Sequence, residues 1–148
     1  MKTKVIAVDI YGTILNSEDY ENAAPVREGF PEFVKKIKDL EIKLISSSDA
    51  DLTTLKLDME EVFRHRLSKP LTLEIFDNFY QLEGIPKDFS QIIKDYKINP
   101  SQLLVIGDQY AKDIQGAKEL GCNVIQVPEY GKEKRENPKF DFSEIIIP

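Results

Sequence analysis

The chain has 148 residues, of which 41% are apolar, and a formal net charge of −6 at pH 7. This length suits one folded domain over residues 1–148, and the negative charge argues against nucleic-acid partners, because a polyanion would be repelled. The only cysteine, Cys122, excludes an intramolecular disulfide and a cysteine metal cluster. The apolar run from Val5 to Val8 is too short for a signal peptide or a membrane span, so we expect a cytoplasmic protein without a membrane partner.

The first predicted strand, Val5 to Val8, ends on a carboxylate. It is followed directly by Asp9-Ile10-Tyr11-Gly12-Thr13. Parallel strands collect ligands at their carboxyl ends, and Gly12 allows a sharp turn without a Cβ penalty. We therefore interpret Asp9 as a candidate nucleophile and expect the Thr13 hydroxyl to orient it. The structural alternative is an aspartate that only ends a strand before a glycine turn.

A helix and a second strand follow. Apolar residues recur at helical spacing from Phe30 to Leu40, with Pro31 suited to the first turn, and residues 42–45 form an apolar strand. That strand runs into Ser46-Ser47-Ser48-Asp49, so hydroxyl groups stand where the first strand has Asp9. The serines could also form a loop that caps the next helix.

The middle of the chain, residues 57–84, fits neither the helical nor the strand period, and we expect a helix, a short strand and loops there. Residues 89–96 then predict a helix that Asn99-Pro100 ends. A further helix with small residues is predicted over residues 111–121. Three more apolar runs predict strands, at residues 103–106, 124–127 and 145–147.

The strand predicted at residues 103–106 also ends on an acid. Gly107-Asp108 follows it, and Asp113 lies five residues after Asp108. A turn with a capped, acidic first helical turn is the structural alternative. Because apolar runs alternate with helical patterns, we predict an α/β fold, a three-layer Rossmann-like doubly wound parallel sheet of about five strands.

The chemistry-bearing residues resemble, in order and context, the four motifs of the haloacid dehalogenase-like superfamily of hydrolases. The resemblance covers about residues 4–128, and its specific elements are the segments 9–13 and 107–113. It implies that Asp9 attacks a phosphomonoester and forms an aspartyl phosphate, which water then hydrolyses. The implied substrate is a phosphorylated small molecule or a phosphoprotein.

A transferring phosphoryl group needs positive charge and hydrogen-bond donors around its oxygens. Clustered carboxylates would bind Mg²⁺, a hard cation that takes oxygen ligands and offsets the repulsion between the nucleophile and the phosphate. The expected ligands are Asp9, Asp108, Asp113 and, by analogy with the family, the backbone carbonyl of Tyr11. The expected phosphate-binding residues are Ser46, with Ser47 as the alternative in register, Gly12 and a lysine.

Two lysines compete for that position. Lys69, in a Lys-Pro dipeptide, lies 39 residues before Asp108, which is long for one helix and one strand. Lys87 lies 21 residues before Asp108, immediately ahead of the helix predicted at residues 89–96, which leads into the strand that ends before Asp108. We prefer Lys87, and a surface lysine is the structural alternative for either.

Tyr11 departs from the phosphatases of this superfamily, which usually carry a second aspartate two residues after the nucleophile. Loss of a general acid typically costs about 10²- to 10⁴-fold in rate. We therefore expect a slow enzyme, or one in which another acid substitutes, with Glu18 and Asp19 as candidates.

Two other functions are compatible with parts of this pattern. The Asp-x-Tyr-Gly-Thr segment also resembles L-2-haloacid dehalogenases, but those enzymes use no metal and lack the acid found here as Asp108. They also insert a cap domain between the first two motifs, for which the chain has no room, and Arg27 is a poor candidate for their substrate-binding arginine. A binding protein that has kept the fold and lost turnover is the third hypothesis.

Without a cap domain the predicted pocket is open to water. A large substrate or a neighbouring subunit would have to exclude it, so we expect a homo-oligomer. Substrate specificity would come from the loops at residues 16–28 and 57–84.

Overall fold

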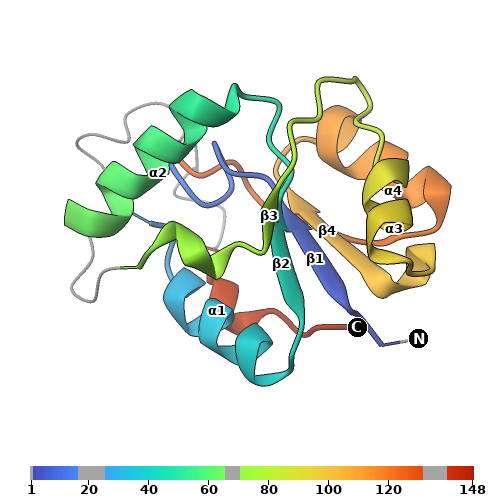
Figure 1. The fold of residues 1–148 in the computed structure, drawn as a ribbon, viewed down its shortest axis with the longest axis horizontal. Coiled ribbons are helices and arrows are strands. Elements are labelled where there is room, and N and C mark those ends of the chain that lie inside the picture. The colour runs from blue at the N-terminus through green and yellow to red at the C-terminus, as the bar shows by residue number, and fades with distance from the viewer. Residues whose placement is uncertain (1, 17–25, 66–70, 132–139) are drawn as a thin grey trace.

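The computed structural model describes residues 2–16, 26–65, 71–131 and 140–148. They form a five-stranded parallel sheet in the order β3-β2-β1-β4-β5, with helices on both faces (Figure 1). The predicted three-layer α/β fold is confirmed.

The sheet consists of short strands. The two most apolar, β1 and β4, lie side by side in its interior. The strands are β1 (Val5–Val8), β2 (Lys43–Ser46), β3 (Asn78–Phe79), β4 (Leu103–Gly107) and β5 (Asn123–Gln126). Every residue of β1 and β4 is buried, as expected for strands covered on both faces. Val8, the last residue of β1, pairs with Ser46 of β2 and Ile106 of β4, so these three strands end at one edge.

The helices divide between the two faces. The helices α1 (Phe30–Asp39) and α2 (Leu52–His65) lie on one side, and α3 (Ser90–Tyr96) and α4 (Gln115–Leu120) on the other (Figure 1). A π-helical turn, Tyr110–Ile114, leads into α4, where Gly116 and Ala117 are buried, whereas the small residues Ala111 and Gly121 are exposed. Among the described helices, none has the length and apolar character needed to cross a bilayer.

Alternation along β1 sends successive side chains into two separate cores. Ile6 and Val8 join the larger core with α1 and α2, while Val5 and Ala7 join the smaller core with α3 and α4. The larger core contains a ring cluster in which Phe142 lies 5.3 Å from Phe30 and 5.4 Å from Phe33 between ring centroids.

The prediction of a strand at residues 145–147 is wrong. A 3-10 turn, Phe142–Glu144, precedes an extended segment that lies against α1, where Lys36 Nζ donates to the Ile145 carbonyl at 2.9 Å. Phe142 anchors this segment in the larger core, and Ile146 is 87% exposed. The short strand expected within residues 57–84 is β3, one of the two edge strands of the sheet.

Candidate active site

The site lies beside β1, where the order in which the chain adds strands to the sheet reverses. From β1 the chain continues to β2 on one side, whereas β4 pairs with the other side of β1. Ligands bind in open α/β sheets at such a crevice, beyond the carboxyl ends of the strands. Asp9 follows β1, Ser46 ends β2 and Asp108 follows β4, so the predicted positions share this edge.

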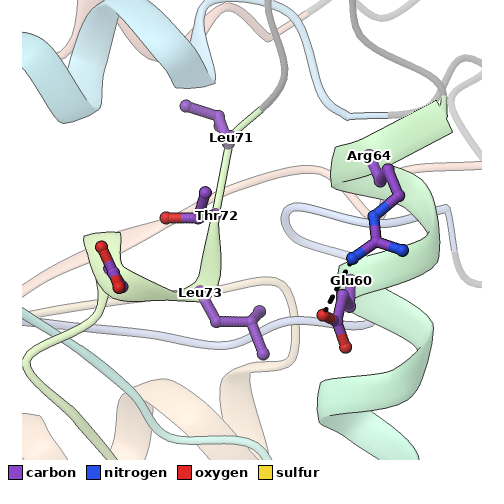
Figure 2. A pocket seen from close by; sticks show the side chains of 6 residues that line it. Glu60, Arg64, Leu71, Thr72 and Leu73 are labelled. Carbon is purple, nitrogen blue, oxygen red and sulfur yellow. Dashed lines mark hydrogen bonds and ion pairs between the residues drawn. The ribbon is translucent and has the colours of Figure 1, made fainter.

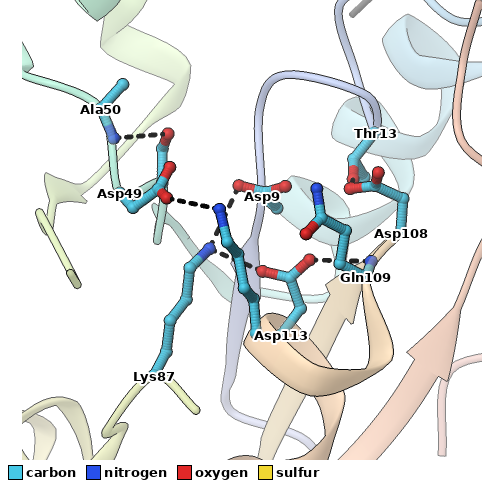
Figure 3. Close-up of polar contacts among 10 residues, drawn as sticks. Asp9, Thr13, Asp49, Ala50, Lys87, Asp108, Gln109 and Asp113 are labelled. Atoms are coloured by element: carbon cyan, nitrogen blue, oxygen red, sulfur yellow. Dashed lines mark hydrogen bonds and ion pairs between the residues drawn. The ribbon is translucent and has the colours of Figure 1, made fainter. Parts of the chain in front are cut away.

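Three buried carboxylates from distant parts of the chain meet there (Figure 3). Asp9, Asp108 and Asp113 each offer a carboxylate oxygen, and these oxygens all lie within 4.8 Å of one another. Asp113 reaches the cluster from the π-helical turn, where its Oδ2 accepts a hydrogen bond from the Gln109 N–H at 3.0 Å. The predicted convergence of the three acids is therefore observed.

Lys87 brings a positive charge into contact with two of the three carboxylates. Its Nζ lies 2.6 Å from Asp113 Oδ1 and 3.3 Å from Asp9 Oδ1, and its side chain is 1% exposed. Lys87 lies in the loop between β3 and α3. Its backbone N–H donates to the carbonyl of Lys112 at 2.9 Å, which fixes this loop to the π-helical turn. The alternative, Lys69, lies outside the described residues.

The electrostatics of the cluster favour an additional cation. Burial raises the pKa of Asp9 well above its usual value, against the effect of Lys87, and the charges of Asp113 and Asp108 raise it further. Burial likewise raises the pKa of Asp108. Burial acts to lower the pKa of Lys87, but the adjacent Asp9 and Asp113 outweigh it and raise that pKa. Among the described residues, the Lys87 ammonium forms ion pairs with two of the three carboxylates, so the negative charge of the cluster is incompletely balanced.

Gly12 and Thr13 form the turn that supports Asp108. Gly12 has a φ of 82°, and a Cβ there would lie 2.7 Å from Asp108 Oδ2, so only glycine fits. Its N–H donates to the Leu15 carbonyl at 2.8 Å. The Thr13 hydroxyl donates to Asp108 Oδ1 at 3.0 Å, which corrects the expectation that it orients Asp9. The turn points this hydroxyl across β1 toward β4, which the sequence does not reveal.

Two side-chain oxygens at the carboxyl ends of the strands are buried without a hydrogen bond from the described residues. Among the residues that the structure describes, no hydrogen-bond partner reaches Ser46 Oγ or Asp108 Oδ2. Ser47 is also buried, and its N–H donates to the Val8 carbonyl at 3.0 Å. Buried polar atoms are rarely left unpaired, so a carboxylate oxygen and a hydroxyl in this state fit a cation and an anionic ligand.

The sequence matches the family model for haloacid dehalogenase-like hydrolases over residues 18–121. The chain belongs to the haloacid dehalogenase-like hydrolase family. The matched residues include Ser46, Lys87, Asp108 and Asp113, whereas Asp9 precedes them. No curated protein matches the sequence.

Several solved structures have the same fold. A predicted phosphoglycolate phosphatase from Haemophilus somnus 129PT is 14% identical, with a TM-score of 0.69 over 97% of this chain and 96% of that chain. A haloacid dehalogenase-like hydrolase from Xanthomonas campestris is 11% identical, with a TM-score of 0.68 over 96% and 92%. D,D-heptose 1,7-bisphosphate phosphatase from B. bronchiseptica, complexed with magnesium and phosphate, is 16% identical, with a TM-score of 0.63 over 87% and 83%. At these identities the likeness concerns the fold.

In this hydrolase the residue two positions after Asp9 contacts a carboxylate from another element. The Tyr11 hydroxyl donates to Asp58 Oδ2 on α2. Sequence reasoning missed this contact, because the two residues are 47 positions apart and no local pattern links them. The other candidate acids, Glu18 and Asp19, lie outside the described residues.

Sequence reasoning also missed an ion pair on the solvent side of the cluster. Lys112 Nζ lies 3.0 Å from Asp49 Oδ2 (Figure 3). Both residues lie in the predicted motif segments, Asp49 after the serine run and Lys112 just before Asp113, but their side-chain pairing depends on the sheet order. This pair is considerably more exposed than the contacts of Lys87.

Arg27 is buried behind the Thr13 turn. Its guanidinium lies 4.9 Å from the ring centroid of Phe140 and 5.3 Å from that of Tyr130, and its Nη1 donates to the Thr13 carbonyl at 3.4 Å. These contacts assign it to packing around the turn.

A cavity lies apart from the carboxylates. A cavity of about 330 Å³ lies between α2 and the segment around Leu73, as Figure 2 shows. Glu60 and Arg64, 3.5 Å apart, line it together with residues 71–74. None of the clustered acids borders this cavity, so it is not part of the candidate active site.

Proposed function

We propose that this hydrolase is a Mg²⁺-dependent phosphatase that uses Asp9 as its nucleophile. The observation that carries the proposal is the contact of the buried Lys87 ammonium with Asp9 and Asp113, beside the unpartnered Asp108 Oδ2. Lys87 would limit the repulsion between Asp9 and an incoming phosphate, and the spare carboxylate oxygen is typical of a cation ligand.

The donor set is suited to magnesium. Asp9, Asp108, Asp113 and the backbone carbonyl of Tyr11 would hold Mg²⁺, which prefers oxygen ligands. When bound, the ion would supply the positive charge that three carboxylates and one ammonium lack. Thr13, through its bond to Asp108, would keep one of these ligands oriented.

The chain's own residues would perform the reaction in two displacements. In the first, a carboxylate oxygen of Asp9 attacks phosphorus, and the bond from phosphorus to the leaving oxygen breaks. Ser46 Oγ would donate to a phosphate oxygen, Ser47 and the Gly12 turn would line the phosphate site, and Lys87 would balance its charge. In the second, water attacks phosphorus and gives up a proton to the solvent, the bond from phosphorus to the Asp9 oxygen breaks, and orthophosphate leaves with the Asp9 carboxylate restored.

The proposed substrate is a phosphomonoester, either a small molecule or a phosphoprotein. One structural neighbour is named as a heptose bisphosphate phosphatase complexed with magnesium and phosphate, which supports phosphate chemistry on this fold. Tyr11 would be a poor acid at neutral pH, so esters with good leaving groups should react best. A single domain without a cap, a homo-oligomeric state and a cytoplasmic location remain predictions.

The test is phosphate release from 4-nitrophenyl phosphate, with Mg²⁺ and with EDTA. We expect Mg²⁺-dependent turnover that Asp9→Asn lowers by at least about 10³-fold, because the amide cannot act as the nucleophile. Asp39→Asn, a change at an exposed carboxylate that ends α1, is the matched control and should retain activity.

Other outcomes would contradict the proposal. Metal-independent halide release from 2-chloropropionate would assign the chain to the dehalogenases. A folded protein with neither activity would indicate a binding protein.

A further inference from the structure

We propose that Lys112 determines substrate specificity by binding a second anionic group, a carboxylate or a phosphate, on the leaving group of the phosphomonoester. In the free protein Asp49 occupies the position of that group. This inference rests on the proposed phosphatase function and concerns the part of the substrate that does not react.

The backbone of Lys112 is attached to the reacting centre. Its carbonyl accepts the Lys87 N–H at 2.9 Å, and Lys87 Nζ in turn lies 3.3 Å from Asp9 Oδ1. Lys112 also directly precedes Asp113 in the π-helical turn. Its position relative to Asp9 is therefore set by the same contacts that hold the buried charges.

The ion pair of Lys112 and Asp49 spans the end of β1. Asp49 follows β2 and Lys112 follows β4, and these two strands pair with β1 on opposite sides. Their side chains meet at 3.0 Å, so the pair crosses in front of the strand that carries Asp9. In Figure 3 the Asp49 side chain points toward the group formed by Asp9, Lys87 and Asp113. A leaving group that extends from a phosphate on Asp9 would pass beside this pair.

Exposure distinguishes this outer pair from the inner one. The side chains of Lys112 and Asp49 are 32% and 43% exposed, whereas those of Lys87 and Asp113 are 1% and 3% exposed. An exposed ion pair is weak because water screens it, so a substrate anion can replace Asp49 at small cost. Asp49 is sufficiently exposed to be solvated when it is released.

The charge of the inner site extends to Asp49. Burial acts to raise the pKa of Asp49, but Lys112 and, at longer range, Lys87 outweigh it and hold that pKa below its usual value. An anion is therefore stabilised at the position of Asp49 by two lysines. A second anionic group of a substrate would have the same stabilisation there.

The test uses matched pairs of aryl phosphates in saturating Mg²⁺. Carboxyphenyl phosphates, in the meta and para isomers, carry a second anion, and the corresponding carbamoylphenyl phosphates have nearly the same shape without it. The ratio of kcat/KM for the anionic to the neutral ester is measured for each variant and divided by that of the wild type, which cancels the different reactivities of the leaving groups. Phenylene bisphosphates, measured alongside, distinguish a second phosphate from a carboxylate.

We expect the ratio to fall about tenfold in Lys112→Gln, a factor that corresponds to about 1.4 kcal/mol. It should rise about threefold in Asp49→Asn, because the competing carboxylate is removed. The double variant should behave like Lys112→Gln. Lys94→Gln, which removes an exposed lysine in the last turn of α3, should leave the ratio unchanged.

Equal losses for both esters in Lys112→Gln and Asp49→Asn, with an unchanged ratio, would overturn the inference and assign the pair a structural role. A fall in the ratio as large in Lys94→Gln would overturn it too, since net charge alone would then explain the effect. Absence of wild-type turnover of either ester would overturn the proposed function itself. Melting temperatures of all variants verify that they fold.

Discussion

Two lysine–aspartate ion pairs lie within one site and differ chiefly in burial. The inner pair joins Lys87 to Asp113 at 2.6 Å, and the outer pair joins Lys112 to Asp49 at 3.0 Å. The inner groups have lost their water, so each depends on its partner, and removal of one leaves an uncompensated buried charge. The outer groups stay solvated, so each can exchange its partner. Burial thus makes the inner pair a fixed part of the site and the outer pair an adaptable one.

The largest effect that tests this comparison is on stability. Lys87→Met should lower the free energy of unfolding of the metal-free protein by about 3–5 kcal/mol, because Asp9 and Asp113 lose the buried cation that contacts them. Lys112→Gln should lower it by less than about 1 kcal/mol, as for other exposed pairs. Urea unfolding at pH 7 measures both values.

Equal losses in these two variants would contradict the distinction between the pairs. Lys38→Gln is a suitable control, because it removes another partly exposed ion pair, in which Lys38 Nζ lies 3.2 Å from Asp77 Oδ2. It should resemble Lys112→Gln.

A carboxylate added at position 11, close to Asp9, should increase turnover. Tyr11→Asp supplies an acid two residues after Asp9, and we expect kcat for a phosphomonoester with a poor leaving group to rise about tenfold or more, since general acid catalysis contributes about 10²- to 10⁴-fold. Tyr11→Asn is the matched control, because it removes the same contact with Asp58 without adding an acid.

No gain in Tyr11→Asp, with the fold intact, would mean that another residue already protonates the leaving group. An equal gain in Tyr11→Asn would attribute the effect to the loss of the tyrosine.

The smallest effect concerns the pH dependence of stability. Burial raises the folded-state pKa of Asp108 above 3.8, its ordinary value. A group with a raised pKa stabilises the fold below its unfolded-state pKa, and this contribution is lost as the pH rises through the folded-state value. The wild type therefore bears a cost at pH 7 that Asp108→Asn avoids, while the amide oxygen still accepts from Thr13.

We expect metal-free Asp108→Asn to melt about 2–4 °C above the wild type at pH 7, the shift for about 1 kcal/mol in a domain of this size. The difference should narrow toward pH 4. Mg²⁺ should raise the melting temperature of the wild type more than that of the variant. A variant that melts lower at pH 7 would contradict this account.

The sequence by itself determined the two central strands, β1 and β4, and the acids at their ends. The apolar runs before Asp9 and Gly107-Asp108 are long enough, and uniform enough, to predict buried parallel strands, and the edge that they share follows from that geometry. The helix at Phe30–Asp39 and the choice of Lys87 rested on periodicity and on chain distance to Asp108. Local pattern suffices for such features, because burial on both faces of a strand is recorded in consecutive residues.

Only the tertiary structure decided the partners. The Thr13 hydroxyl donates to Asp108, Lys112 pairs with Asp49, and Tyr11 reaches Asp58, all across gaps of 47 to 95 residues. The apolar end of the chain, residues 145–147, has the composition of a strand, yet Phe142 packs it against α1. Side-chain contacts of this kind depend on the order of the strands and on which core an aromatic ring enters, and neither is a property of the residues next to them in the chain.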